Sequence, residues 1–162
     1  VYYDVIRQKT ASLLASCCAC GAASTGADED AIEQMRQFGE HVGMAFQIKD
    51  DIFDYGDGAN IGKPTGIDIK ERKMTLPLIY ALNHADKSQR RRVINIVKNH
   101  NEDKAKVQEV INFVVESGGI KYAVEKMHEY RKKALDILHK FEDNDARRSL
   151  EGLVIYTTER NK

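Results

Sequence analysis

Residues 43–77 read GMAFQIKDDIFDYGDGANIGKPTGIDIKERKMTLP, a helical pattern with an acidic end that runs into a glycine-rich loop. Four polar residues fall at i, i+3, i+4 and i+7, so a helix would carry them on one stripe about 100° wide: Gln47, Asp50, Asp51 and Asp54. Like charges at such spacings destabilise an isolated helix by about 0.2–0.5 kcal/mol per pair. A bound cation would offset that repulsion.

The helix that carries this stripe is expected to begin between Asp28 and Asp30 and to run through Tyr55. Gly39 and Gly43 fall on the same side of the helix as the acids. Because an internal glycine costs about 1 kcal/mol relative to alanine, two of them four residues apart predict close packing against another helix. A plainly exposed acidic face would explain the acids but not the glycines.

Amphipathic helical patterns account for most of the chain on both sides of this stretch. The glycines around Pro64 predict a loop over residues 56–66. No alternating apolar pattern bounded by hairpin turns is present, so the sequence predicts an all-α fold. The expected helices cover residues 4–23, 28–55, 75–84, 88–100, 103–117, 120–141 and 145–160.

Length and charge exclude several classes of function. The chain has 162 residues, enough for one domain or most of one, and its 25 basic and 25 acidic residues balance. Neither nucleic acid nor an anionic membrane surface is therefore an expected partner, and the basic run at residues 90–92 has no interleaved aromatic. The longest apolar run, residues 13–23, is shorter than the roughly 20 residues that span a bilayer.

Cysteine usage points to a reducing compartment. Cys17, Cys18 and Cys20 crowd one segment, and no distant cysteine could complete a disulfide or a zinc site. We interpret them as small buried residues on the apolar side of the first helix, next to Leu13, in a cytoplasmic protein. The chain opens at Val1 within a helical pattern, without Met, so we expect a piece of a longer protein.

The aspartate stripe and the lysines of the following segment suit a phosphorylated substrate. Carboxylates without neighbouring Cys or His are ligands for Mg²⁺ rather than for zinc or copper, and Mg²⁺ shares phosphate oxygens with its substrate. Lys63 and Lys73 could bind such a substrate, although a surface salt bridge is the favoured interpretation for each lysine taken alone. No Walker A sequence is present, and a diphosphate leaving group fits the charges better than nucleotide hydrolysis.

Four motifs together resemble the trans-isoprenyl diphosphate synthases, or polyprenyl synthetases. The second aspartate-rich motif of that family is similar to QIKDDIFD at residues 47–54, and the loop after it to GKPTGID at residues 62–68. KMTLP at residues 73–77 resembles the next helix start, and KTA at residues 9–11 resembles an upstream Lys-Thr pair. The chain resembles medium- and long-chain bacterial types, such as octaprenyl diphosphate synthase, more than farnesyl synthases.

The resemblance implies an isoprenoid-synthase bundle around a deep cavity, in which isopentenyl diphosphate condenses with an allylic diphosphate. In the family the allylic diphosphate ionises with the help of Mg²⁺, and the isopentenyl double bond attacks the carbocation. By this resemblance Asp50 would be a Mg²⁺ ligand, and Asp51 and Asp54 would be ligands or would support one. Lys9 and Lys63 would contact the diphosphate.

The resemblance also implies roles for further residues of the same motifs. Thr10 and Gln47 would line the cavity near the reacting carbon, offering dipoles to the cation and hydrogen bonds to the leaving group. Lys73 is a third candidate for binding diphosphate, and Asp68 lies in the same segment. Arg72 stands where the family often has glycine.

The family's first aspartate-rich motif and the basic residues that bind isopentenyl diphosphate do not appear before Lys9. We therefore expect residues 1–162 to be the C-terminal portion of one synthase domain, inactive alone and self-associating, most simply as a homodimer. A non-catalytic helical subunit that modulates a partner synthase is the alternative. A terpene cyclase of the same fold is disfavoured, because cyclases usually replace this aspartate motif with an Asn/Ser/Glu pattern.

Overall fold

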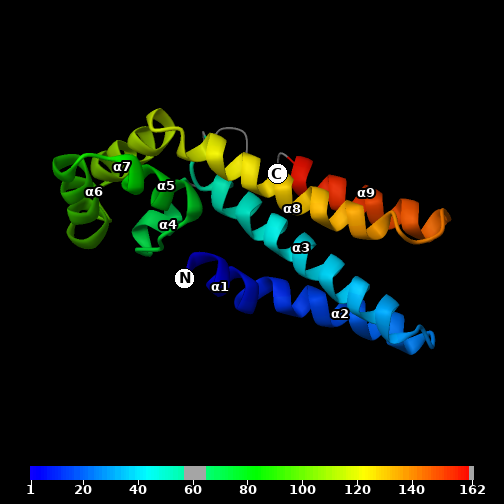
Figure 1. Ribbon diagram of the computed structural model, residues 1–162. Coiled ribbons are helices and arrows are strands. Elements are labelled where there is room, and N and C mark those ends of the chain that lie inside the picture. The colour runs from blue at the N-terminus through cyan, green and yellow to red at the C-terminus, as the bar shows by residue number, and fades with distance from the viewer. Residues whose placement is uncertain (57–64, 161–162) are drawn as a thin grey trace. The chain divides into compact units, whose positions relative to one another are not determined.

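The computed structural model describes residues 1–56 and 65–160, which form helices and no strand (Figure 1). An all-α fold was predicted, and the described residues confirm it. Contacts between residues divide the chain into two compact units. The first unit contains residues 1–48 and 126–160, and the second contains residues 49–125.

The first unit is built on α3 (Glu29–Phe53), most of which belongs to it. Its other helices are α1 (Tyr2–Ile6), the π-helical segment η1 (Arg7–Ala11), α2 (Ser12–Ser24), the C-terminal part of α8 (Gly119–Leu138) and α9 (Asp145–Glu159). Apolar residues three or four apart on α3, α8 and α9 form the core of this unit. The buried members are Phe38, Val42, Ala134, Ile137, Leu138 and Val154.

The two glycines of α3 lie directly against α2 and η1. A Cβ built on Gly39 would lie 2.5 Å from the backbone oxygen of Leu14, and one built on Gly43 would lie 2.5 Å from the Cα of Ala11. No side chain fits at such distances, because a methyl group needs more than 3 Å of separation from backbone atoms. The predicted close packing of a second helix at these glycines is confirmed.

The second unit contains the end of α3 and four shorter helices, α4 (Ile67–Lys70), α5 (Leu76–His84), α6 (Lys87–Asn99) and α7 (Lys104–Glu116), followed by the start of α8. Asp86 and Asp103 begin α6 and α7 by accepting hydrogen bonds from the first free backbone amides of these helices. The core is aliphatic and joins α5, α6 and α7. It includes Leu78, Leu82, Val93, Ile96, Val110 and Val114.

The predicted helices are all present, and two local features were not predicted. The short helix α4 falls within a charged segment for which the sequence predicts no helix. The segment η1 interrupts the first predicted helix with π-helical geometry. A single π turn has no clear composition signature.

The burial of the first helix was predicted wrongly in part. Leu13 is 68% exposed, and both Cys17 and Cys20 are exposed thiols, whereas Cys18 is half-buried. The reason is that η1 and α2 pack on α3 through a narrow face, with Ala11 of η1 and Ala15 of α2 in it, so residues on the other faces of α2 remain open within this chain. Within the described ranges, no helix is both long and apolar enough to cross a membrane.

Candidate functional site

Within the first unit, a hydrogen bond joins the KTA motif at residues 9–11 to Gln47, the first residue of the aspartate-rich motif. The Thr10 hydroxyl donates to Oε1 of Gln47 at 2.9 Å, across 37 residues of sequence. The bond is possible because Ala11, the residue after Thr10, rests against Gly43, one helical turn before Gln47. The glycine of α3 therefore sets the distance at which the two polar side chains meet.

Lys9 and Thr10 both lie in the π-helical segment η1. Single π turns inside α-helices occur frequently at functional sites, because the wider turn shifts side chains and carbonyl groups out of the regular helical register. Lys9 is exposed and Thr10 is half-buried. The irregular turn thus coincides with the Lys-Thr pair that the sequence singled out.

The aspartate motif occupies the C-terminal end of α3. Asp50 and Asp51 lie in the last turns of the helix, and Asp54 follows its last residue, Phe53. Asp51 is only 6% exposed and Asp54 only 9%, whereas Asp50 is half-buried. Two of the three carboxylates are thus largely withdrawn from solvent.

Asp54 has a clear structural partner within the second unit. Its carboxylate accepts hydrogen bonds from the backbone N–H of Ile67 at 2.8 Å and of Asp68 at 3.1 Å, which are free amides of the first turn of α4. Burial, and after it the neighbouring Asp68 carboxylate, raise the pKa of Asp54 to about 6 despite these hydrogen bonds. The last aspartate of the motif therefore connects the end of α3 to α4.

Lys73 pairs with acidic residues of its own segment. Its ammonium lies 3.1 Å from Oδ1 of Asp68 and 2.5 Å from Oε2 of Glu71. These partners, the Glu71 carboxylate first, raise the pKa of Lys73. The surface salt bridge that the sequence offered as an alternative is present, and any diphosphate contact would have to compete with it.

A second polar contact in this region was not anticipated from the sequence. The hydroxyls of Tyr55 and Thr75 lie 2.5 Å apart and are buried, and burial raises the pKa of Tyr55. Thr75 immediately precedes α5, so the bond ties the residue after Asp54 to the start of that helix. The TLP motif contained the only signal, a threonine in the N-cap position before proline.

Arg72 adopts the left-handed backbone conformation, with φ at +59°, the only such non-glycine residue in the described chain. This conformation favours glycine, which is the residue often found here in the family that the sequence resembles. Arg72 therefore adopts the backbone conformation that a glycine would adopt at this position.

The described residues contain no group of three His, Cys, Asp or Glu side chains arranged to hold a metal ion. The carboxylates of the aspartate motif nevertheless suit Mg²⁺. This ion commonly binds one or two protein carboxylates and takes its remaining ligands from water and phosphate. Asp50 is partly accessible and forms no ion pair within the described ranges. Asp50 thus has the chemistry and the access that such a ligand needs.

The remaining candidate, Lys63, lies outside the described residues. Of the others, the first unit brings Thr10 and Gln47 into contact, and in the second unit Asp54 and Lys73 each form a hydrogen bond with Asp68.

Comparison with known proteins identifies the same family that the sequence motifs resemble. Residues 1–114 match the family model described as polyprenyl synthetase. The chain is 35% identical over 161 residues to heptaprenyl diphosphate synthase component 2 of Geobacillus stearothermophilus, covering 99% of this chain and 49% of that protein. It spans about half the length of the curated relatives it matches.

Solved structures resemble the chain over nearly its whole length. Geranylgeranyl pyrophosphate synthase of Bacteroides thetaiotaomicron matches with a TM-score of 0.87 and 38% identity, covering 98% of this chain and 51% of that one. Polyprenyl synthase of Caulobacter crescentus CB15, solved with calcium and isoprenyl diphosphate, matches with a TM-score of 0.89 and 31% identity, covering 99% and 49%. By sequence motifs, family model and fold alike, this chain belongs to the polyprenyl synthetase family.

Proposed function

We propose that the chain is the C-terminal portion of a Mg²⁺-dependent polyprenyl diphosphate synthase, which condenses isopentenyl diphosphate with an allylic diphosphate in the cytoplasm. The C–O bond to the allylic diphosphate breaks, a C–C bond forms to the isopentenyl unit, and a proton leaves that unit. Diphosphate is the leaving group. When bound, Mg²⁺ would neutralise charge that develops on the departing diphosphate.

The proposed metal residues are Asp50 as a ligand, and Asp51 and Asp54 as further ligands or as support for one. Asp50 is the leading ligand because Asp54 already accepts two backbone hydrogen bonds. Hard oxygen donors also suit the calcium named for the Caulobacter crescentus CB15 structure, a member of the same family.

Lys9, Lys63 and Lys73 are the proposed diphosphate contacts. A lysine ammonium is a point charge with three donors and is a common phosphate ligand. Lys9 is exposed in η1, whereas Lys73 would first have to leave Asp68 and Glu71. Lys9 is therefore the stronger of the two described candidates.

The hydrogen bond between Thr10 and Gln47 is the observation that carries the proposal. A buried or half-buried pair of this kind holds each side chain in one rotamer, so that the remaining lone pairs point in a fixed direction. Fixed oxygen dipoles can stabilise a developing allylic cation without reorganising during the reaction. The role of both residues is that of orienting dipoles near the reacting carbon.

The metal part of the proposal is tested by titrating Mg²⁺ into the chain with and without inorganic diphosphate, followed by calorimetry. We expect Mg²⁺ to bind with diphosphate present and to bind far more weakly without it, because the ion shares phosphate oxygens. Asp50→Asn should abolish the diphosphate-dependent binding. Glu102→Gln, which removes one charge from an exposed site in the second unit, should leave it unchanged.

Equal Mg²⁺ binding by wild type and Asp50→Asn would contradict the assignment of the metal site. Activity is tested separately by joining the chain to the N-terminal half of the Bacteroides thetaiotaomicron synthase and measuring prenyl products by mass spectrometry. We expect products from the joined protein with Mg²⁺ and none from the 162-residue chain alone. Condensation by the chain alone would refute its proposed incompleteness.

The second hypothesis for the function is a non-catalytic subunit that modulates a partner synthase. The relatives reported above carry names of synthases, which favours the enzyme. In the joined protein, activity that survives Asp50→Asn and Lys9→Ala would favour the subunit.

A further inference from the structure

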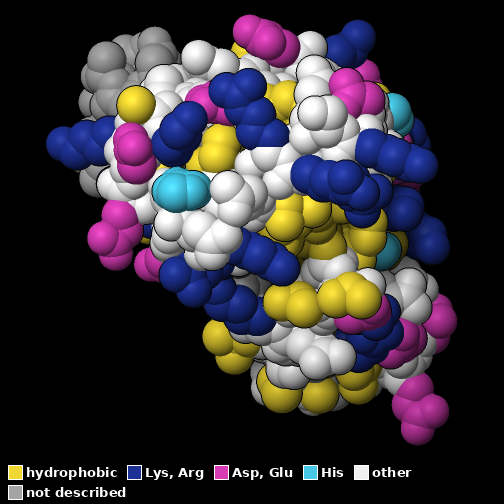
Figure 2. Space-filling model, turned by 90° about the vertical axis from the view of Figure 1, so that its left-hand side faces the viewer, with side chains coloured by type: hydrophobic (Ala, Val, Ile, Leu, Met, Phe, Trp, Pro, Cys, Tyr) yellow, Lys and Arg dark blue, Asp and Glu magenta, His cyan; other side chains and the backbone are white. Residues whose placement is uncertain are grey.

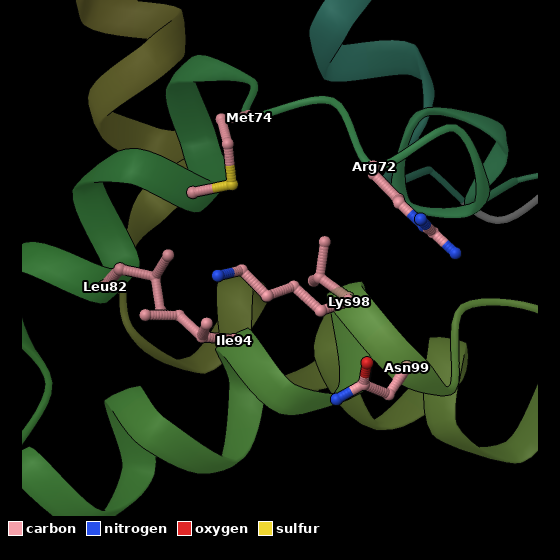
Figure 3. Close-up of a pocket in the computed structure, with 7 residues that line it drawn as sticks. Arg72, Met74, Leu82, Ile94, Lys98 and Asn99 are labelled. Carbon is pink, nitrogen blue, oxygen red and sulfur yellow. The ribbon is translucent and has the colours of Figure 1, made fainter.

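The second unit contains a cavity of about 680 Å³ that the proposed chemistry does not use. It lies between the segment that joins α4 to α5, helix α5 and helix α6 (Figure 3). Cavities that bind small molecules commonly have volumes of about 300–1,000 Å³. None of the residues assigned to metal or diphosphate lines it.

The walls of this cavity are aliphatic. Leu82 and Val97 belong to the core of the second unit, and Ile94 packs against that core from α6. Met74 stands at the cavity with 45% of its surface exposed. Methionine is flexible and polarisable, so it adapts to aliphatic chains of different shape. The interior therefore suits an apolar chain rather than a polar ring.

Two cationic side chains stand at the same cavity. Lys98 extends from α6 across the opening toward Leu82 and Met74, and Arg72 lies at the other side of the opening, its guanidinium directed away from Met74 (Figure 3). Neither side chain has an ion-pair partner within residues 1–56 and 65–160. Figure 2 shows the side of the molecule where α4 to α7 lie, with hydrophobic side chains surfacing among Lys and Arg.

We propose that this cavity binds an amphiphilic anion, an aliphatic chain with a phosphate or carboxylate head, at a site separate from the proposed diphosphate contacts. The chain would contact Leu82, Ile94 and Met74, and the head would pair with Lys98. The ligand is either a free amphiphile or a lipid whose tail enters from a membrane.

Decyl phosphate is a suitable probe because it has an aliphatic tail and an anionic head but no allylic diphosphate. Binding is followed by the methyl resonances of methionine in NMR, in EDTA, so that metal-dependent binding of phosphate is removed. The chain has four methionines, and Met74→Leu assigns the relevant signal. We expect the Met74 signal to shift with saturation at one molecule per chain. An unmoved Met74 signal would overturn the proposal.

Lys98→Met tests the head group while it keeps an aliphatic stem in place. We expect affinity for decyl phosphate to fall roughly tenfold or more, because one charge-assisted contact is lost. The matched control is Lys121→Met, which removes the same charge from an exposed position of the second unit. Equal loss in both variants would show a general charge effect and would contradict the site.

The two sources of ligand are separated by a vesicle experiment. Phosphatidylglycerol vesicles that sediment wild type but not Lys98→Met would identify a lipid as the source. Vesicles that fail to sediment wild type, together with a saturable shift from decyl phosphate, would identify a free amphiphile. Failure of both probes would contradict the site without bearing on Mg²⁺ binding at Asp50, which is measured independently.

Discussion

The position of Thr10 depends on the absence of a side chain at Gly43. Ala11 is fully buried and lies where the Cβ of residue 43 would be. Any side chain there would push η1 away from α3, and a shift of a few tenths of an ångström would lengthen the hydrogen bond of 2.9 Å between Thr10 and Gln47. A residue without functional groups thus controls the geometry of two residues that have them.

Gly43→Ala is expected to lower the free energy of unfolding by about 1–3 kcal/mol, the usual range for overpacking a core contact. Gly21→Ala is the matched control, because no atom lies within 4 Å of its added Cβ. In the interior of α2 that change should raise stability by about 1 kcal/mol through helix propensity. Urea unfolding followed by circular dichroism measures both. A neutral or stabilising Gly43→Ala would mean that η1 is not held as closely to α3 as described.

Arg72→Gly is expected to stabilise the protein by about 0.5–1 kcal/mol. A left-handed backbone costs a non-glycine residue about 1–2 kcal/mol, and the larger entropy of glycine in the unfolded chain cancels about 0.5–1 kcal/mol of the gain. The opposite sign is expected for Lys70→Gly in α4, where glycine should cost about 1 kcal/mol. Thermal unfolding of the two variants beside wild type gives the comparison. Destabilisation by Arg72→Gly would show that the guanidinium contributes more than the strain removes.

At the scale of elements, the end of α3 is tied to α4 by one carboxylate. Asp54 satisfies two backbone amides that would otherwise lack partners at the start of a four-residue helix. Such a short helix has no independent stability, because helix nucleation is unfavourable. The aspartate motif therefore has a structural member as well as its proposed metal ligands.

This division of roles predicts different effects of two substitutions in the absence of metal. Asp54→Ala should cost about 1–3 kcal/mol, because two part-buried amides lose their acceptor. The cost should be larger at pH 5 than at pH 8, because burial and Asp68 disfavour the ionised carboxylate. Asp50→Ala should be neutral or stabilising by about 0.2–0.5 kcal/mol, since it relieves repulsion on the stripe. Chemical unfolding in EDTA distinguishes them. Equal destabilisation would assign Asp50 a structural contact as well.

The sequence predicted the long elements well because periodicity defines them. The helix expected over residues 28–55 is α3, Glu29–Phe53, and its packing at Gly39 and Gly43 followed from the cost of glycine in a helix. α4 was missed because four residues contain about one helical turn and no period. The bond between Tyr55 and Thr75 could not be foreseen, since it depends on where α5 returns to the end of α3.

Functional assignments came from motif spacing and resemblance rather than from periodicity. Thr10 and Gln47 were expected near one reacting carbon, and the structure brings them into contact, although their chemical role stays a prediction. Lys73 shows the limit of such reasoning, because a lysine in a motif can be held by local acids such as Asp68. Whether such a lysine forms a salt bridge or binds a ligand depends on interaction energies, and these cannot be derived from the spacing of residues in the sequence.

At the scale of the whole molecule, the chain spans about half of the heptaprenyl and geranylgeranyl synthases compared above and exposes apolar side chains. In the first unit, exposed apolar residues lie on helices at both ends of its sequence. They are Val5 at 54%, Leu13 at 68%, Leu153 at 56% and Tyr156 at 67% exposure. A contiguous patch of exposed apolar side chains tends to be covered by another chain, because burying it removes apolar area from water.

We therefore expect the 162-residue chain to self-associate at micromolar concentration, most simply as a dimer. Light scattering coupled to gel filtration gives the mass directly. Leu13→Glu should shift the population toward monomer, because a charge replaces a side chain that is 68% exposed in the single chain and would be buried on association. Asn83→Glu adds the same charge at an exposed position of α5 and should leave the mass unchanged. A monomeric wild type would show that this apolar surface is tolerated in water, and an oligomer insensitive to Leu13→Glu would place the interface elsewhere.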